Sequence, residues 1–225
     1  QGYSSAASDV YKRQTHTWRC RHADGTEREY VERAIEGGLK ILGFSDHSPY
    51  PFPDGYDSGM RMRLDQVEGY VDTVLALKKE YDKDIEIHLG LETEYFPRFW
   101  EQLIDFLSDY PFEYFVLGQH SLGNEIEKIL YSGHGTTDGS YLKQYVDQCL
   151  AGIDTGKYLY LAHPELFEGK MAGVFVETQA ELTLGKTVTD LQSDKKFEQK
   201  NALVLLKLDR EAFMQLLKDC IRTLP

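Results

Sequence analysis

The chain has 225 residues, of which 41% are hydrophobic and 28% charged, as expected for one sizeable globular domain rather than a disordered chain. Its formal net charge of −12 argues against nucleic acid or an anionic membrane as a partner, although bound metal ions could still attract an anionic substrate. The three cysteines form no CxxC pair and no apolar run could span a bilayer, which favours a soluble protein in a reducing, cytoplasmic setting.

The first fourteen residues do not resemble the start of a domain. Residues 1–14 show no helix or strand period, and the stretch Ser4–Gln14 resembles the translation of a sequencing-library adapter. We therefore expect residues 1–14 to be a non-native leader and exclude them from the fold prediction.

After this leader the chain shows regular patterns. Thr26 and Glu29 have the spacing of a capping box, and Gly37–Gly38 provides a stop, so we predict a helix over 26–37. Residues 48–59 form a long polar loop rich in proline and glycine, a kind of loop that often carries an active site. The remaining apolar patterns predict strands at 40–47, 84–95, 113–121 and 157–163, and helices at 64–81, 97–107 and 141–150.

Strands alternate with helices, which predicts an α/β fold whose parallel strands have their carboxyl ends on one face. Starting with a short first strand around the THT sequence, the strands end on side chains that can bind metal ions. These are His16, His47, Glu92, His120 and His163, joined by His22 in the loop after the first strand. Imidazoles with a carboxylate suit zinc, iron or manganese, which would activate a water and stabilise charge on phosphate oxygens. Asp46 and Thr15 or Thr17 are candidates for hydrogen bonds that orient these ligands.

Each of these residues has a structural explanation when taken alone, so the metal-site hypothesis rests on their coincidence. His88 shares a strand face with Glu92, but a structural role is favoured, and His134 is predicted to lie on the surface. Trp100 and Tyr145 are predicted core residues. Five arginines could contact a phosphate but are predicted to be surface charges: Arg19, Arg21, Arg61, Arg63 and Arg98.

Six motifs carry a resemblance to a known family. In order and spacing THT, CRHA, GFSDHSPY, GLETEY, GQHS and AHPEL resemble those of the PHP (polymerase and histidinol phosphatase) superfamily, and within it the histidinol-phosphatase branch. The resemblance covers about residues 15–167. It implies a distorted, TIM-like (β/α) barrel, here partial, with up to three divalent metal ions. It also implies hydrolysis of histidinol phosphate to histidinol and phosphate in histidine biosynthesis.

The resemblance assigns the ligands of three metal ions: His16 to the first, His22 and His47 to the second, and Glu92, His120 and His163 to the third, with Glu92 as a bridge. The last three would form the catalytic set. Two departures weaken the first two ion sites. Gln14 stands where the first motif of the family has a histidine, and the late Asp-x-His motif of the family has no counterpart after His163.

The end of the chain resembles a different family. From about Ala172, the stretches VETQAELTLGKTVTD and NALVLLKLDREAFMQLLK resemble the C-terminal segment of inosine–uridine-type nucleoside hydrolases. The aspartate-rich calcium motif of that family does not occur here. We therefore predict a truncated phosphatase domain over 15–167, followed at 168–225 by an unrelated β-β-α tail that a chimeric fusion has joined to it.

The patterns support three hypotheses about function. The first is a metal-dependent phosphomonoesterase that acts on a small phosphorylated metabolite, histidinol phosphate. The second is a nucleoside hydrolase, which the missing aspartate cluster disfavours. The third is a chimeric fragment that binds a metal ion without turnover. The sequence leaves open the identity of the metal and the oligomeric state.

Overall fold

The computed structural model describes residues 11–12, 15–132 and 139–162. The chain forms two compact units, the first comprising residues 1–93 and 98–116 and the second comprising residues 94–97 and 117–225. Several predicted features lie outside the described residues: Gln14, His134, His163, Cys220 and the β-β-α tail at 168–225.

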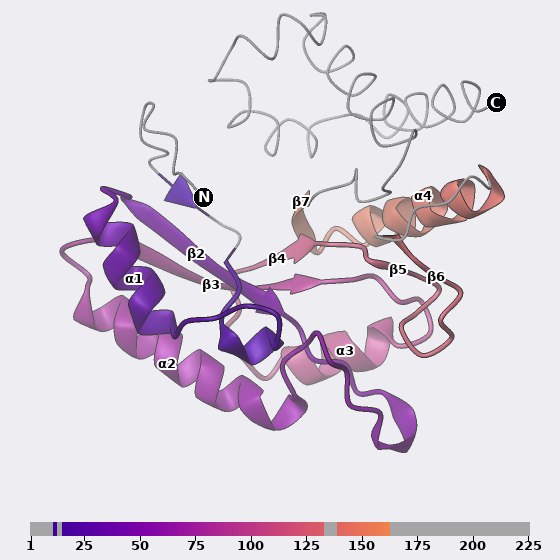
Figure 1. Ribbon diagram of the computed structural model, residues 1–225, viewed down its shortest axis with the longest axis horizontal. Helices are drawn as coiled ribbons and strands as arrows, with labels where there is room; N and C mark the ends of the chain where they lie inside the picture. The colour runs from indigo at the N-terminus through magenta and orange to yellow at the C-terminus, as the bar shows by residue number, and fades with distance from the viewer. Residues whose placement is uncertain (1–10, 13–14, 133–138, 163–225) are drawn as a thin grey trace, which may run out of the picture. The chain divides into compact units, whose positions relative to one another are not determined.

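The first unit is built around a parallel sheet (Figure 1). Its strands lie in the order β1 (Tyr11–Lys12), β2 (Ile41–His47), β3 (Glu86–Thr93) and β4 (Tyr114–Leu117), the last residue of which belongs to the second unit. β1 and β3 both pair with β2 in parallel, and strands alternate with helices along the chain. The predicted α/β class with parallel strands is therefore confirmed.

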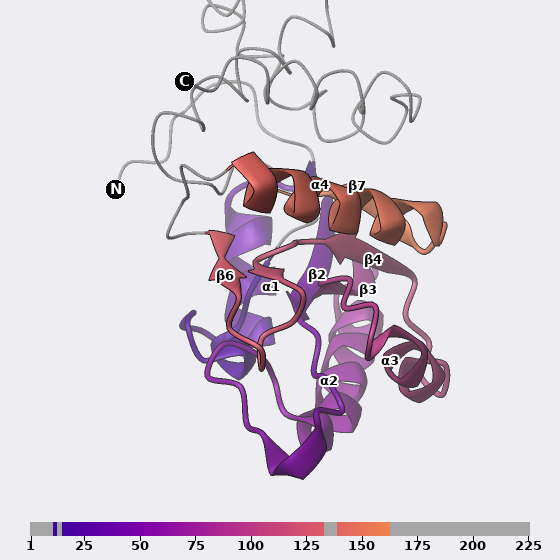
Figure 2. The same ribbon diagram turned by 90° about the vertical axis from the view of Figure 1, so that its right-hand side faces the viewer.

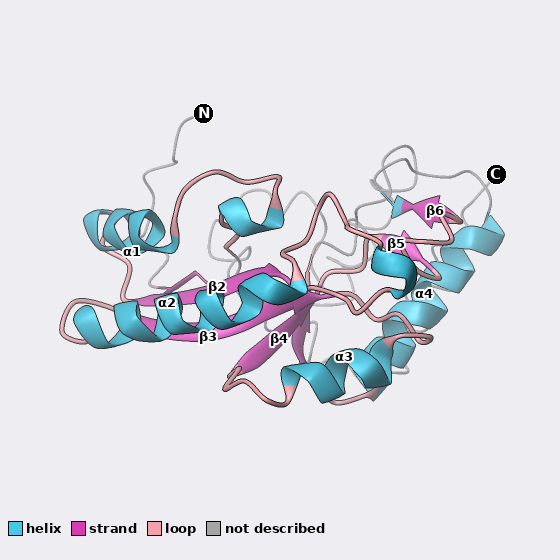
Figure 3. Ribbon diagram, turned by 90° about the horizontal axis from the view of Figure 1, so that it is seen from below, coloured by secondary structure: helices cyan, strands magenta, loops and turns pink. Residues whose placement is uncertain are grey.

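Helices of the first unit cover this sheet. They are α1 (Glu27–Glu36), α2 (Val67–Glu80) and α3 (Trp100–Leu107), with short 3₁₀ turns η1 (Trp18–Cys20), η2 (Pro53–Gly55) and η3 (Leu64–Gln66). α2 runs along β2 and β3 (Figure 3), and its apolar face is buried at Val67, Val71 and Val74. The buried Tyr70 hydroxyl donates to the Gly90 carbonyl at 2.9 Å, which ties the helix to β3.

The second unit contains a short hairpin and a long helix. Strands β5 (Ser121–Leu122) and β6 (Leu130–Tyr131) pair in antiparallel fashion. Helix α4 (Gly139–Asp154) runs beside β7 (Tyr158–Leu161), as Figure 2 shows. The Ala162 amide donates to the Leu117 carbonyl at 2.8 Å, a bond between the residue after β7 and the last residue of β4, both of which belong to this unit.

Several predicted boundaries need correction. Residues 15–17 are not part of a strand, and the first strand among the described residues is Tyr11–Lys12, which lies inside the leader excluded from the prediction. The strand predicted at 113–121 ends at Leu117, because the chain then turns toward the β5–β6 hairpin. The helix predicted from Pro97 begins at Trp100, after a turn. Within the described part of the chain, no helix is both long and apolar enough to cross a membrane.

The predicted capping box at the start of α1 is confirmed. The Glu29 amide donates to Thr26 Oγ1 at 3.3 Å, and the Thr26 amide donates to Glu29 Oε2 at 2.7 Å. Each bond satisfies a backbone donor that the first turn of a helix leaves without an intrahelical partner.

We expect the Thr26→Ala variant to lower the free energy of unfolding by about 1 kcal/mol, because it removes one half of this box. Thr73→Ala is the matched control, because Thr73 is a half-buried threonine inside α2 whose hydroxyl donates to the Gly69 carbonyl four residues earlier. Urea denaturation followed by circular dichroism measures both. Equal losses in the two variants would show that the cap has no special contribution.

Candidate metal centre

The centre begins at the carboxyl ends of β2 and β3. The parallel register places His47 directly beside Glu92, and both side chains are buried, with Glu92 fully inaccessible to solvent. The Ser48 amide donates to the Glu92 carbonyl at 2.8 Å and so holds the two strand ends together. His47 Nδ1 lies 3.8 Å from Glu92 Oε1. A buried carboxylate is therefore placed next to an imidazole at one end of the sheet.

His16 is positioned by the two threonines beside it. The Thr15 amide donates to Ser45 Oγ at 3.1 Å, and the Thr15 hydroxyl donates to the Gly43 carbonyl at 3.0 Å. The amide and the hydroxyl of Thr17 both donate to the carboxylate of Asp46. These bonds attach the segment on either side of His16 to β2, while the predicted orienting role of the threonines and of Asp46 stays a prediction.

His22 is placed by the turn that follows. The segment η1 begins after Thr17 and ends at Arg21, whose φ of 65° reverses the chain so that His22 turns back toward His16. His22 Nδ1 lies 3.0 Å from the Cys20 carbonyl oxygen, which can only accept a hydrogen bond. The proton of a neutral imidazole is then on Nδ1, and the lone pair is on Nε2.

These side chains converge on one place. The ring centroids of His16 and His47 lie 4.5 Å apart, those of His22 and His47 4.9 Å, and those of His16 and His22 5.4 Å. His16 Nε2 is 3.2 Å from Glu92 Oε2, and ligand atoms of His16, His47 and Glu92 all lie within 4.8 Å of one another. Four of the predicted ligands, His22 included, are therefore brought together.

The residues present suit a divalent cation. His16 Nδ1 is buried without a hydrogen-bond partner among the described residues, although a buried polar atom normally has one. Three imidazoles and a carboxylate are also the donor set that zinc, iron or manganese prefers. Zinc in particular binds imidazole nitrogen and carboxylate oxygen with bonds of about 2.0–2.2 Å. Side chains grouped in this way can reach one such ion.

Burial changes the acidity of two neighbouring groups. Desolvation raises the pKa of the Asp46 carboxyl to about 6, against the opposing effect of its hydrogen bonds from Thr17. Desolvation, together with the nearby Asp46 carboxylate, raises the pKa of the Cys20 thiol to about 12. Sequence reasoning did not consider Cys20 as a functional residue, although its position two residues before His22 in CRHA was a usable signal.

His120 belongs to the second unit, where it follows β4 by three residues. Its Nδ1 lies 3.4 Å from Oε1 of Glu94, a fully buried carboxylate. Glu94 Oε2 accepts the amides of His120 and Ser121 at 3.0 and 2.8 Å. Sequence reasoning missed Glu94, although it stands two residues after Glu92. His163, the remaining predicted ligand, lies outside the described residues.

The structure separates the other predicted candidates. His88 pairs with Glu86 and Glu113, at 2.9 and 2.7 Å, and the structural role favoured for it stays a prediction. Trp100 and Tyr145 are buried, as predicted.

The surface prediction is wrong for Arg61, which is 1% exposed. Its guanidinium lies 5.3 Å from the centroid of a tyrosine ring, an arrangement that allows a cation to be buried.

The loop predicted to belong to an active site lines an open pocket. The segment 49–65 lines a space of about 350 Å³ and contributes Tyr50, Tyr56, Arg61 and Arg63 to it. The two carboxylates that line this space are paired with arginines, Asp65 with Arg63 at 2.9 Å and Asp57 with Arg21 at 2.7 Å. The Met62 amide donates to the His47 carbonyl at 3.3 Å, so this loop is attached to the strand that carries His47.

The family model described as PHP domain matches residues 13–219. A protein named "Probable histidinol-phosphatase" from Deinococcus radiodurans is 29% identical over 80% of this chain, and the histidinol-phosphatase of Bacillus subtilis is 35% identical over 56% of it. The chain spans only 62% and 45% of the lengths of these two relatives.

A solved structure has a similar fold. The histidinol phosphate phosphatase of Lactococcus lactis, complexed with zinc, L-histidinol and phosphate, matches with a TM-score of 0.57 at 20% identity, covering 93% of each chain. A C-terminal stretch of 63 residues is 48% identical to a pyrimidine-specific ribonucleoside hydrolase of Shewanella baltica. Because the family match itself continues to residue 219, the boundary after residue 167 stays a prediction.

Proposed function

Because this chain belongs to the PHP domain family, we propose that it is a divalent-metal-dependent phosphoric monoester hydrolase that acts on histidinol phosphate. The observation that carries the proposal is the convergence of His16, His22, His47 and Glu92 at the carboxyl ends of β2 and β3. The curated relatives named as histidinol-phosphatases support the substrate, and the zinc of the Lactococcus lactis complex makes zinc the first ion to test.

The residues of the chain have distinct tasks in this proposal. His16, His22, His47 and Glu92 would hold the ions, whose chemistry is to make water a better nucleophile and to offset the charge on phosphate oxygens. Thr17 and Asp46 keep His16 in position, and the Cys20 carbonyl keeps the Nε2 lone pair of His22 available. From the sequence pattern alone, we add His120 and His163 as further ligands and include both with Glu92 in the catalytic set.

The test is release of inorganic phosphate by the purified chain. We expect hydrolysis of histidinol phosphate in the presence of zinc or manganese, and loss of at least about tenfold in rate when a chelator removes the ion. Inosine serves as the control substrate. Ribose release from inosine without phosphate release from histidinol phosphate would instead support a nucleoside hydrolase.

The Gln14→His variant provides a more sensitive form of the same test. The family motif has a histidine at this position, so we expect the variant to bind zinc more tightly and to hydrolyse the ester faster than the parent chain. Thr26→Ala, away from the centre, controls for effects on stability. If both the parent and Gln14→His bound zinc but released no phosphate, a metal-binding chain without turnover would be the better account.

Two further features of this proposal concern the setting of the protein. We place the activity in the cytoplasm, because the described cysteines Cys20 and Cys149 are free and buried. We also propose a small-molecule partner rather than nucleic acid or membrane, because the net charge of the chain is −12.

A further inference from the structure

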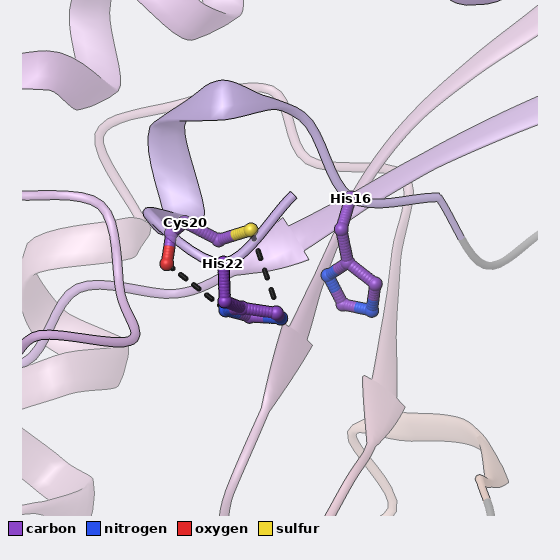
Figure 4. Close-up of side chains that lie close together, drawn as sticks. All are labelled: His16, Cys20 and His22. Atoms are coloured by element: carbon purple, nitrogen blue, oxygen red, sulfur yellow. Dashed lines mark hydrogen bonds between the residues drawn. The ribbon is translucent and has the colours of Figure 1, made fainter. Parts of the chain in front are cut away.

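A thiol lies beside the candidate metal centre, and the proposed function does not use it. Figure 4 shows Cys20, His16 and His22 grouped around one point, with the Cys20 side chain directed toward the His22 ring. One ligand atom from each of the three residues lies within 4.8 Å of the others. Cys20 is fully buried, while His22 is exposed and so leaves a route from solvent.

The distances suit coordination of one ion by sulfur and nitrogen. Cys20 Sγ lies 3.8 Å from His22 Nε2. Tetrahedral zinc with bonds of about 2.3 Å to sulfur and about 2.0–2.1 Å to nitrogen separates the two ligand atoms by about 3.6 Å. The Nδ1 hydrogen bond to the Cys20 carbonyl directs the Nε2 lone pair of His22 toward the thiol. An ion between them therefore needs little rearrangement of either side chain.

We propose that Cys20 is a metal ligand and that, with His16 and His22, it forms a site for a thiophilic divalent cation such as zinc, cobalt or cadmium. The inference goes beyond the proposed function, which needs only imidazole and carboxylate ligands, and shares with it His16 and His22. Thiolate is a soft ligand, so Cys20 biases the centre toward these ions and away from magnesium or manganese.

Binding is a proton-for-metal exchange in which no electrons are transferred. The Cys20 S–H bond breaks, its proton goes to solvent, and the sulfur–metal bond forms. The thiol now donates to the Thr17 carbonyl at 3.0 Å, and this hydrogen bond is lost in the exchange. A bound cation supplies the positive charge that stabilises a buried thiolate.

Cobalt(II) is a suitable probe, because a thiolate ligand gives it an intense charge-transfer band in the near ultraviolet. We expect titration of the full chain with cobalt to produce this band and Cys20→Ser to abolish it, while the weaker visible absorption from imidazole-bound cobalt remains. Cys149→Ser is the matched control, because Cys149 is equally buried and free, with a pKa likewise raised to about 12 by burial. This variant should keep the band.

Metal preference gives a second readout. Cys20→Ser should weaken cadmium binding by about 10- to 100-fold and should change manganese binding much less, because only the soft ion depends on sulfur. The inference is overturned if the parent chain binds cobalt without a thiolate band, or if Cys20→Ser retains the band. Neither result would affect the proposed function, which is tested separately by phosphate release; a thiolate band without any hydrolysis would contradict only the function.

Discussion

The Glu92→Gln variant is expected to lose about half or more of the stabilisation that zinc gives to this protein. At a free zinc concentration about 100 times the dissociation constant, the parent chain should gain about 2.7 kcal/mol of stability through linkage. Glu92 supplies the only carboxylate in the candidate cluster formed by His16, His47 and Glu92, and its side chain is fully buried. Replacing an anionic oxygen by a neutral amide should therefore weaken the binding of a divalent cation by at least tenfold.

A loss of metal response in this variant is not explained by unfolding. In the metal-free protein, Glu92→Gln removes a carboxylate that must be desolvated, so the stability of the apo form should fall little or even rise. Glu86→Gln is the matched control, because Glu86 starts the same strand but is exposed and pairs with His88. Thermal melting with and without zinc measures both variants. Retention of the full zinc shift by Glu92→Gln, or an equal loss in Glu86→Gln, would contradict the assignment.

The Gly90→Ala variant is expected to destabilise the protein by about 1–3 kcal/mol through overpacking. A Cβ at this position would lie 2.5 Å from two ring atoms of Tyr114. The ring cannot swing away freely, because the Tyr114 hydroxyl donates to the Phe44 carbonyl at 2.8 Å. Gly90 is also held by the Tyr70 hydroxyl. The added methyl group should therefore displace β3, and with it Glu92 two residues further on.

Three further variants identify the cause of this effect: Gly59→Ala, Tyr114→Ala, and Gly90→Ala combined with Tyr114→Ala. Gly59→Ala is the control, because a Cβ there meets nothing within 4 Å, and we expect a change within about 0.5 kcal/mol. Combining Gly90→Ala with Tyr114→Ala removes the clash, so the double variant should be more stable than the sum of the single losses. Chemical denaturation gives the free energy of unfolding of each variant and of the parent chain. Strict additivity, or a Gly90→Ala variant as stable as Gly59→Ala, would show that a clash with the Tyr114 ring is not the cause of the destabilisation.

Sequence analysis anticipated features that depend on local spacing. The box formed by Thr26 and Glu29 is confirmed because its two bonds join residues only three positions apart. The pairing of His47 with Glu92 follows from two apolar strands that end on ligand-type side chains, since parallel strands bring these ends together. The predicted resemblance to the PHP superfamily and its histidinol-phosphatase branch is confirmed by the family match and the curated relatives.

Features that depend on contacts between distant segments were not predictable in the same way. The THT sequence has the composition of a strand. Thr15 and Thr17 nevertheless donate hydrogen bonds to side chains and a carbonyl of β2, about thirty residues later in the chain. Arg61 was assigned to the surface because arginine usually lies there, whereas here a tyrosine ring and the surrounding loop bury it. The position of Cys20 beside the His22 ring depends on the turn after Thr17, which the sequence pattern does not predict.

The most direct test of the metal centre is an anomalous difference map from crystals grown with zinc and measured at the zinc absorption edge. We predict a peak within about 2.0–2.2 Å of a ring nitrogen of His16 or His47 and of a Glu92 carboxylate oxygen. A second peak bonded to Cys20 Sγ would agree with the further inference. Anomalous peaks confined to surface groups such as His88, with His16, His47 and Glu92 free of any ion, would contradict the account.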